Sequence, residues 1–560
     1  MPSFLLKPEV ALFLSLALGH LVGRLRFRSI EVGGICGTLI VALAIGQFGV
    51  TLSADLKNVS FAVFIFALGF TAGPQFFANI RSGWRYGIFS VLEATTVVAL
   101  VVVAVLVFGF DPGTSAGLLA GSATESAVVG TASEALARLG HAPEMVKTLQ
   151  GNLATAYSLT YLFGLVSIVV VTSQIAPLLL GINLRENAAA LARKMGGGGE
   201  DGSGMLGLPA LVGRAFRAGA VAGSEVGAIE REAGYGLAIE RVLRGGELIE
   251  ATPDTALHAG DVLLVVGRRG AVLAVQDRLG EEVPLPPEIN VPIVSQDAVL
   301  TRKEAVGQTM AALRALAASE ARTGRGVFIG RMRRSQHDIP VLPETVVQRG
   351  DVVTLYGTRR AVDQAIADFG YALRPTDKTD FIFLGLGVLL GIFIGQLSVK
   401  LGPADLTLGT GGGALLSGLV FGWLHLRYPR LTSFPAPAAE VLKDFGLATF
   451  IAAIGLSTGP DAIRLIKNYG LVLPVLGIVV SVGPALVSLF VGHKIMKVEP
   501  PILLGAIAGQ HCSTPTISAL VSVAGNSTPV IGYSVTYAIS NIILPLLGPV
   551  VVVLAAALGR

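Results

Sequence analysis

The feature that most constrains this chain is a series of apolar segments long enough to cross a lipid bilayer. In the first part of the chain they lie near 9–25, 31–50, 59–79, 86–110 and 152–180. In the last part they lie near 380–398, 409–427, 441–459, 470–492 and 528–556. A helix needs about 20 apolar residues to span the hydrocarbon core of a bilayer. We therefore predict an α-helical polytopic membrane protein with ten full spans.

The composition supports a membrane protein with a soluble insert. Of the 560 residues, 52% are hydrophobic and 14% are charged. The net charge of +4 is small and its basic residues are dispersed, so we expect no nucleic-acid partner. The two cysteines, Cys36 and Cys512, have no metal-binding spacing, and we expect no metal and no cofactor. The first apolar run ends in Arg24 without a cleavage site, which indicates a span and not a signal peptide.

The two membrane halves repeat the same landmarks in the same order. Ala67–Pro74, ALGFTAGP, matches Ala453–Pro460, AIGLSTGP, and a basic residue follows each, Arg81 or Lys467. Further on, YSLTY at 157–161 matches YSVTY at 533–537. Several matched landmarks in one order indicate an internal duplication of five spans.

One repeated landmark is an apolar stretch that is interrupted by polar residues. Gly117–Leu136, GLLAGSATESAVVGTASEAL, corresponds to Gly505–Ala524, GAIAGQHCSTPTISALVSVA. Irregular backbone at membrane depth is tolerated only where it is buried in protein or lines a wet cavity. A pair of such interruptions in corresponding places of two halves points to a transporter binding site. Each is predicted to be a re-entrant or discontinuous helix, within 114–138 and 500–525.

Close packing through small residues is the alternative explanation of these stretches. It accounts for their Gly, Ala, Ser and Thr content. It does not account for Glu125, or for the run from His511 to Pro515.

Charge placement predicts which way the repeats face. Arg24, Arg26 and Arg28 follow the first span and Arg81 and Arg85 follow the third, so both loops are expected in the cytoplasm. If 114–138 dips in and returns, residues 183–378 are cytoplasmic and both termini are periplasmic. Five spans per half then invert the second repeat relative to the first. Arg427 and Arg430 agree with inversion, whereas Arg464 and Lys467 do not.

The soluble insert is itself a tandem repeat. Gly260-Asp261-Val262 and Gly350-Asp351-Val352 each lead into an apolar run, a Gly turn and a helical pattern. Each copy is predicted to fold as a small α+β unit of strands followed by a helix. The expected organisation is membrane repeat one at 1–182, a Gly-rich linker at 183–205, regulatory module one at 206–284, module two at 289–373 and membrane repeat two at 379–560.

The insert resembles the C-terminal, TrkA-C-like, ligand-binding module of potassium-conductance regulators. No GxGxxG loop precedes either copy, so the nucleotide-binding half of those regulators is absent. With the duplicated membrane halves, the GPQFF segment at 73–77 and the AGS and AGQ interruptions, the layout resembles the aspartate–alanine exchanger family of bacterial antiporters. The resemblance implies exchange of an acidic amino acid or C4-dicarboxylate for a small amino acid such as alanine, across the inner membrane.

An acidic substrate needs hydroxyls, backbone N–H groups at half-helix ends and a fixed cation. The candidate substrate-binding residues are Arg81, Ser122, Thr124, Glu125, Ser126, Tyr157, Gln510, His511, Cys512, Ser513, Thr514, Thr516, Tyr533 and Asn541. Candidate packing or hinge residues are Gly69, Gly73, Pro74, Gly455, Gly459, Pro460 and Pro515. Arg81 fits a snorkelling residue at the membrane interface as well as it fits a substrate ligand. For Glu93 and His20 we expect a role in helix packing.

Two other functions were weighed against transport by exchange. An enzyme is not expected, because no base lies at motif spacing from Cys512 or Ser513. A cation channel or cation transporter gated by the regulatory modules is the alternative. The expected partners are small carboxylates or amino acids, membrane lipid, a small regulatory ligand on 206–373 and a second copy of the chain in a homodimer.

Overall fold

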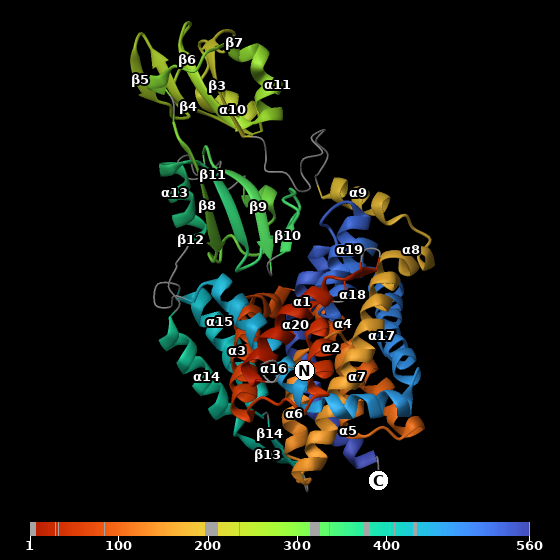
Figure 1. Ribbon diagram of the computed structural model, residues 1–560. Coiled ribbons are helices and arrows are strands. Elements are labelled where there is room, and N and C mark those ends of the chain that lie inside the picture. The colour runs from red at the N-terminus through yellow and green to blue at the C-terminus, as the bar shows by residue number, and fades with distance from the viewer. Residues whose placement is uncertain are drawn as a thin grey trace. The chain divides into compact units, whose positions relative to one another are not determined.

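The computed structural model describes most of the chain as helices in one unit and sheets in another (Figure 1). The described residues are all except 1–6, 28–29, 32, 83, 196–210, 235, 290, 314–324, 335–336, 374–379, 402–403, 408, 429–433 and 559–560. One compact unit comprises Met1–Ala188 and Pro375–Arg560, and the other comprises Ala189–Arg374.

The membrane unit contains two series of helices in the same order. The first consists of α1 (Pro8–Gly23), α2 (Gly34–Gly46), α3 (Ala54–Ser82), α4 (Trp84–Phe108), α5 (Pro112–Ser122), α6 (Ala127–Ala137), α7 (Pro143–Val170), the π-turn η2 (Val171–Ile175), α8 (Ala176–Leu179) and α9 (Leu184–Lys194). The second consists of α14 (Phe381–Gly395), α15 (Gly409–Arg427), α16 (Ala436–Tyr469), α17 (Val472–Phe490), η5 (Val491–Ile495), α18 (Pro500–Gln510), α19 (Thr514–Ala524) and α20 (Val530–Leu558). A short strand pair follows the first helix of each series, β1 (Arg26–Phe27) with β2 (Ile30–Glu31) and β13 (Ser398–Leu401) with β14 (Ala404–Thr407).

The two series pack on each other reciprocally. α3 lies along α15 as α16 lies along α2, and α7 contacts α17 as α20 contacts α4. Within each series the broken helix lies against the last helix, α5 on α7 and α18 on α20. In Figure 1 the pair α5 and α6 lies toward one end of the membrane unit, and α18 and α19 lie toward the other. This arrangement is the one expected of two related repeats with opposite orientations.

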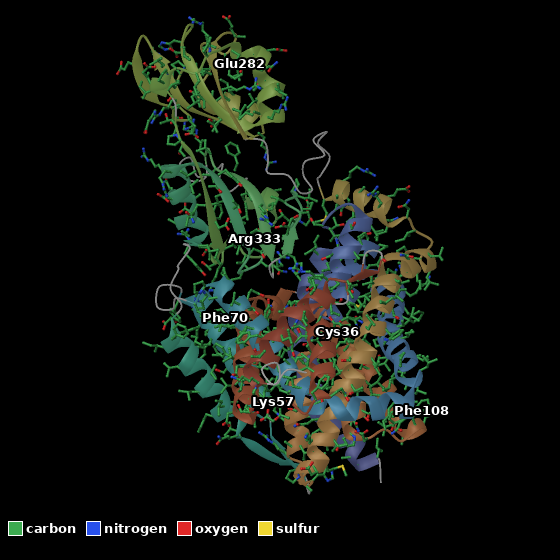
Figure 2. The ribbon with its side chains drawn as sticks, viewed as in Figure 1. Cys36, Lys57, Phe70, Phe108, Glu282 and Arg333 are labelled. Carbon is green, nitrogen blue, oxygen red and sulfur yellow. The ribbon has the colours of Figure 1, made fainter. Side chains whose placement is uncertain are left out.

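Glycine lets the paired helices approach closely. A Cβ atom on Gly69 would lie 2.3 Å from the Leu415 carbonyl oxygen, and one on Gly73 would lie 2.5 Å from that of Leu419. In the other repeat, a Cβ on Gly455 would lie 2.7 Å from the Ala42 Cβ. Gly459 approaches Gly46 equally closely. Phe70 of α3, labelled in Figure 2, lies in the membrane unit, and its ring packs on that of Phe434. Any side chain at these glycines would push the helices apart. Pro74 and Pro460 follow inside α3 and α16.

Six helices of the described chain are long and apolar enough to cross a membrane. They are Ala54–Pro74, Arg85–Phe108, Pro143–Leu179, Pro437–Gly459, Val472–Ile495 and Val530–Leu558. The prediction of ten full-length spans therefore needs correction. The other four, α1, α2, α14 and α15, are helical at their predicted places, but the first three contain only 16, 13 and 15 residues, and α15 has 19 residues but is not among the six. The chain leaves the helical conformation early there, and the strand pairs β1–β2 and β13–β14 follow α1 and α14.

The soluble unit consists of two antiparallel five-stranded sheets, each with a helix after its Gly-Asp strand. Module one has β3 (Leu211–Ala218), α10 (Val226–Glu232), β4 (Leu237–Arg244), β5 (Glu247–Glu250), β6 (Val262–Arg268), α11 (Arg269–Leu279) and β7 (Gly280–Val283), in the order β5-β4-β6-β3-β7. After η4 (Pro287–Ile289), module two has β8 (Ile293–Leu300), β9 (Phe328–Arg334), β10 (His337–Ile339), β11 (Val352–Thr358), α13 (Arg359–Phe369) and β12 (Gly370–Ala372), in the order β10-β9-β11-β8-β12. The equivalent strand orders confirm a tandem repeat of α+β modules.

Each Gly-Asp turn contains an ion pair between its buried Asp and an Arg of a neighbouring strand. Gly260 and Gly350 have φ of 86° and 89°, values that favour glycine. Asp261 accepts the His258 N–H at 2.8 Å and pairs with both Arg244 Nε and Nη2, at 3.0 and 2.8 Å. Asp351 repeats the arrangement with Arg334, at 2.8 and 2.7 Å. The Asp that recurs in both modules is thus a structural residue of the turn.

Candidate functional site

The two helix breaks are in direct contact, although they are far apart in the sequence. The break between α5 and α6 covers 123–126, and the break between α18 and α19 covers 511–513. Thr124 and Cys512 have φ of 53° and 49°, in the left-handed region that residues other than glycine rarely adopt. The Thr124 hydroxyl donates a hydrogen bond to the main-chain carbonyl of His511. The structure therefore brings the two interrupted stretches together at one place.

Each break also touches a buried tyrosine of the last helix in its own repeat. Ser126 Oγ lies 2.7 Å from the Tyr157 hydroxyl, and Thr514, which follows the second break, interacts with Tyr533. Both tyrosines are fully buried. The broken helices reach α7 and α20 closely because of glycine: a Cβ on Gly121 would lie 2.0 Å from Thr160 Oγ1, and the same holds at 2.2 Å for Gly509 and Thr536. The duplication thus preserves the contacts around the breaks.

Glu125 is a buried carboxylate at the start of α6. Its Oε1 accepts the main-chain N–H of Ala127 at 3.0 Å, and Cys512 of the second break lies near its side chain. Lys443 of α16 lies close enough to interact with it electrostatically. A carboxylate at a helix N-terminus is stabilised by the exposed N–H groups and the helix dipole. Glu125 therefore occupies the anion-binding end of α6 itself.

Glu93 is a second buried carboxylate, contributed by α4. Its Oε1 lies 2.8 Å from Nδ1 of His511, and both side chains are 0% exposed. The sequence predicts a packing role for Glu93, whereas the structure pairs it with His511. The signal that could have identified it is a charged residue in the middle of an otherwise apolar span.

Hydroxyl groups surround the N-terminus of α19. Ser513 caps the helix, with its Oγ 2.6 Å from Thr516 Oγ1, and Pro515 lies in the first turn. Thr514 and Pro515 are exposed, whereas Ser513 and Thr516 are buried. Nearby polar groups have no hydrogen-bond partner among the described residues: Ser122 Oγ and both amide atoms of Gln510, all fully buried. Unsatisfied buried polar groups call for a further partner, such as a ligand or water.

For two predicted site residues the described part of the structure gives no contact with this constellation. Asn541 of α20 donates its amide to the Tyr537 carbonyl at 2.8 Å, one turn along its own helix. Arg81 belongs to the last turn of α3, and its side chain is outside the described part of the structure. Pro460, a predicted hinge residue, lies in α16, and its side chain is also outside the described part of the structure.

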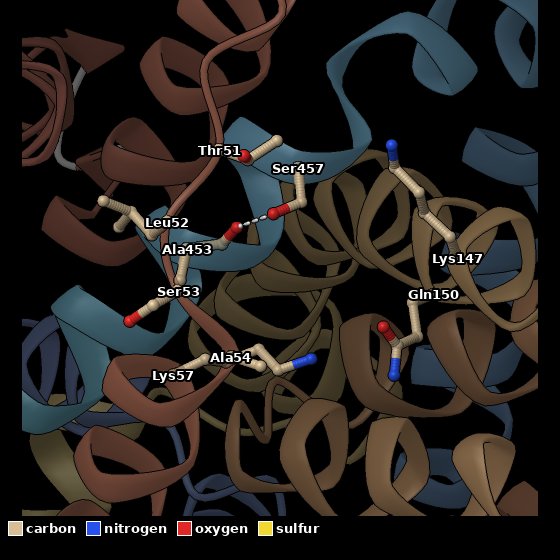
Figure 3. A pocket seen from close by; sticks show the side chains of 9 residues that line it. All are labelled: Thr51, Leu52, Ser53, Ala54, Lys57, Lys147, Gln150, Ala453 and Ser457. Atoms are coloured by element: carbon tan, nitrogen blue, oxygen red, sulfur yellow. Dashed lines mark hydrogen bonds between the residues drawn. The ribbon is translucent and has the colours of Figure 1, made fainter. Parts of the chain in front are cut away.

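A pocket of about 210 Å³ opens between α3, α7 and α16, lined by none of the predicted site residues (Figure 3). Its lining residues are Thr51, Leu52, Ser53, Ala54, Lys57, Lys147, Gln150, Ala453 and Ser457. It carries two lysines and no acidic side chain, and Gln150 also donates to the Ser133 carbonyl of α6 at 3.0 Å. This composition suits an anion. Sequence reasoning missed it because Lys57 and Lys147 each lie near the start of a helix, where lysine is unremarkable.

Similarity to known proteins covers both the membrane unit and the insert. Residues 11–177 and 383–553 match the family model described as a predicted permease membrane region, and residues 216–280 and 302–370 match the TrkA-C domain. An uncharacterized transporter of Zymomonas mobilis is 38% identical over 98% of this chain and 97% of its own. Uncharacterized transporters of Bradyrhizobium diazoefficiens, covering 97% of each chain, and Bordetella parapertussis, covering 99% of this chain and 98% of its own, are each 36% identical. No solved structure matches the chain.

Proposed function

Because this chain belongs to the aspartate–alanine exchanger family of membrane permeases, we propose that it is an antiporter of the bacterial inner membrane. It exchanges an acidic amino acid or C4-dicarboxylate for a small amino acid such as alanine. The observation that carries this proposal is the direct contact between the two helix breaks, made by Thr124 and His511. Paired broken helices meeting within a duplicated membrane unit are the arrangement that many secondary transporters use for their substrate.

The groups at the breaks suit a carboxylate. The α19 N-terminus offers main-chain N–H groups, and Thr514 offers an exposed hydroxyl. Gln510 and Ser122 contribute buried polar groups that have no partner among the described residues. Fixed N–H and O–H donors replace the water that a carboxylate loses on entering the membrane. Glu125 already fills the N-terminus of α6, which leaves the α19 end for the substrate.

Alternating access is supported by an asymmetry between the two repeats. Helix α6 is buried along α20, where Thr131 donates to the Pro545 carbonyl at 2.7 Å. The corresponding helix α19 leaves Thr514, Ser518 and Ser522 exposed. Helix α6 is thus covered by other helices of the membrane unit, whereas the corresponding helix α19 is partly uncovered. In the other conformation of the transport cycle, α6 would be exposed and α19 would be buried. The π-turn η2 (Val171–Ile175), which follows α7 and contacts α19, would be the surface on which α19 packs.

The insert regulates transport under this proposal. It lies in the cytoplasm, the second repeat is inverted and both termini are periplasmic. Its two TrkA-C modules bind a small ligand and pair with those of a second subunit. Such a ligand changes transport only by binding one conformation of the protein more tightly than the other.

Counterflow in proteoliposomes tests the proposal. Vesicles loaded with unlabelled aspartate, succinate or alanine should accumulate external labelled aspartate, and empty vesicles should not. Flux that ignores the internal substrate, or a current carried by K⁺ or Na⁺ alone, would instead establish the regulator-gated cation channel or transporter. If no carboxylate drives counterflow, the proposed substrate class is wrong.

A further inference from the structure

Lys57 of α3 and Lys443 of α16 occupy the same position in the two membrane repeats. Each follows a leucine, and each lies ten residues before the first alanine of the repeated landmark, Ala67 or Ala453. Both helices are among the candidate membrane spans. An ionisable residue within a membrane span indicates a functional site. Its recurrence at one position of the duplication indicates a role that the two repeats share.

α3 and α16 cross in opposite directions, so the two lysines lie on opposite sides of the crossing. A Cβ on Gly446 would lie 3.0 Å from the Phe64 Cβ, whereas Lys57 lines a pocket together with Ala453. Residue numbers therefore rise along α16 as they fall along α3. Because Ala453 follows Lys443 by ten residues, the two lysines are separated by about 15 Å along the helix pair. One lysine is thus directed to each side of the membrane.

Lys57 has no acidic partner among the described residues. The lining of its pocket of about 210 Å³ includes Lys147 and no acidic side chain, and Figure 3 shows the Lys57 side chain extending toward Gln150. Ala54 takes the place that Glu440 has in the second repeat, so α3 supplies no carboxylate one turn before its lysine. A half-buried ammonium group is stabilised by an anion beside it. Lys57 is therefore available to an anion from outside the chain.

Lys443 is half-buried as well, but it has carboxylates around it. Its Nζ lies 2.5 Å from Oε2 of Glu440, one turn earlier in α16. Asp444 and Glu125 of the first break lie close enough to interact with it electrostatically. An anion that reaches Lys443 therefore competes with groups of the protein, and its net attraction is weaker than at Lys57.

We propose that Lys57 and Lys443 bind the side-chain carboxylate of an acidic substrate as it passes between the helix breaks and the two sides of the membrane. The inference rests on the transport function proposed above and adds residues that select an acidic substrate over alanine. In the topology proposed there, α3 begins at the periplasmic side and α16 at the cytoplasmic side. Lys57 then captures the substrate from the periplasm, and the competition from Glu440 at Lys443 favours its release into the cytoplasm. Alanine has no second carboxylate and gains from neither lysine.

Transport measured from each side of the membrane tests the proposal with the full-length protein. Right-side-out and inverted membrane vesicles, prepared from cells that overproduce the protein, are loaded with alanine, and uptake of labelled aspartate or labelled alanine gives a KM for each side. The wild-type KM for aspartate should be lower at the periplasmic side. Lys57→Gln should raise that KM about fivefold or more, and Lys443→Gln should do the same at the cytoplasmic side. The KM for alanine should change little in either variant.

Three further variants sharpen the test. Glu440→Gln removes the competitor of Lys443 and should lower the cytoplasmic KM for aspartate. Lys443→Arg keeps the positive charge and should restore most of the affinity that Lys443→Gln loses. Lys494→Gln neutralises an exposed lysine of η5 and should leave both KM values unchanged.

The outcomes separate the two proposals. If wild type exchanges no carboxylate, the proposed function is wrong and this inference falls with it. If wild type exchanges aspartate but both glutamine variants keep its KM on both sides, the lysine assignment is overturned and the exchanger stands. Equal increases for aspartate and alanine assign the lysines to structure and also overturn it. If Lys443→Gln elutes as aggregate in detergent, Glu440→Gln decides, because an unchanged cytoplasmic KM there contradicts the role of Lys443.

Discussion

The hydroxyl of Thr124 donates a hydrogen bond to the carbonyl of His511, so a residue of the first repeat completes the backbone of the second at the point where both helices are interrupted. A carbonyl that ends a half-helix has no partner within that helix. The contact therefore satisfies a group that the break exposes and holds the two breaks together.

Removing this hydroxyl should destabilise the membrane unit. Thr124→Val keeps the shape but leaves the His511 carbonyl without its donor, at a cost of about 1–3 kcal/mol. We expect a lower melting temperature in detergent, while Thr124→Ser stays close to wild type. Thr148→Val is the matched control, because the Thr148 hydroxyl bonds an exposed carbonyl of its own helix. Equal losses in both valine variants would show that the Thr124 contact has no special importance.

The hydroxyls beside the two tyrosines should contribute to substrate binding. Ser126→Ala or Thr514→Ala removes a donor near the carboxylate, and we expect affinity to fall roughly 5- to 150-fold, the equivalent of about 1–3 kcal/mol. Binding can be measured by calorimetry with purified protein. Thr95→Ala, an exposed hydroxyl on α4, should have no effect. Wild-type affinity in both site variants would place the substrate elsewhere.

The pocket between α3, α7 and α16 should attract the anionic substrate before it reaches the breaks. Lys57→Gln and Lys147→Gln each remove one positive charge from a lining without acidic residues. We expect the KM for aspartate to rise and that for alanine to change little, more clearly at low ionic strength because salt screens exposed charges. Lys494→Gln, an exposed lysine of η5, is the control. Parallel increases for aspartate and alanine would indicate a structural role.

Thiol labelling should report the asymmetry of the repeats. In a Cys36→Ser/Cys512→Ser background that retains exchange, Ser518→Cys on α19 should react readily with a water-soluble maleimide, and Ser133→Cys on α6 should not. Substrate conditions that favour the opposite conformation should reverse the two rates. Reactivities that stay fixed under every substrate condition would contradict alternating exposure of these helices.

Acid should weaken module one through Asp261. Burial alone would raise the pKa of Asp261, but hydrogen bonds from Arg244 and the His258 N–H outweigh it and lower the pKa. Because the folded pKa is lowered, this stabilisation is complete above the unfolded value of about 3.9 and is lost as pH falls through the folded value. Arg244→Gln should therefore lower the calorimetric transition of module one at pH 7, and the difference from wild type should shrink below about pH 4. A difference that is independent of pH would remove Asp261 from the explanation.

The sequence predicted what depends on local pattern and failed where distant packing decides. Apolar runs, the matched ALGFTAGP and AIGLSTGP landmarks and the Gly-Asp turns follow from hydropathy and repetition, so family and modules could be recognised. The pairing of Glu93 with His511 depends on how α4 packs against the second repeat, which neither local pattern contains. The Lys57 pocket likewise needs three helices from two repeats.

The labelling rate of Cys512 tests the central claim, that the substrate binds at the two breaks, most directly. Cys512 is the half-buried thiol of the second break, and a Cys36→Ser background leaves it as the single thiol of the chain. Transported aspartate should slow its alkylation by a small permeant reagent, with half-protection at the concentration that half-saturates transport. A non-transported amino acid should have no effect. An unchanged alkylation rate at saturating transported substrate would contradict the account.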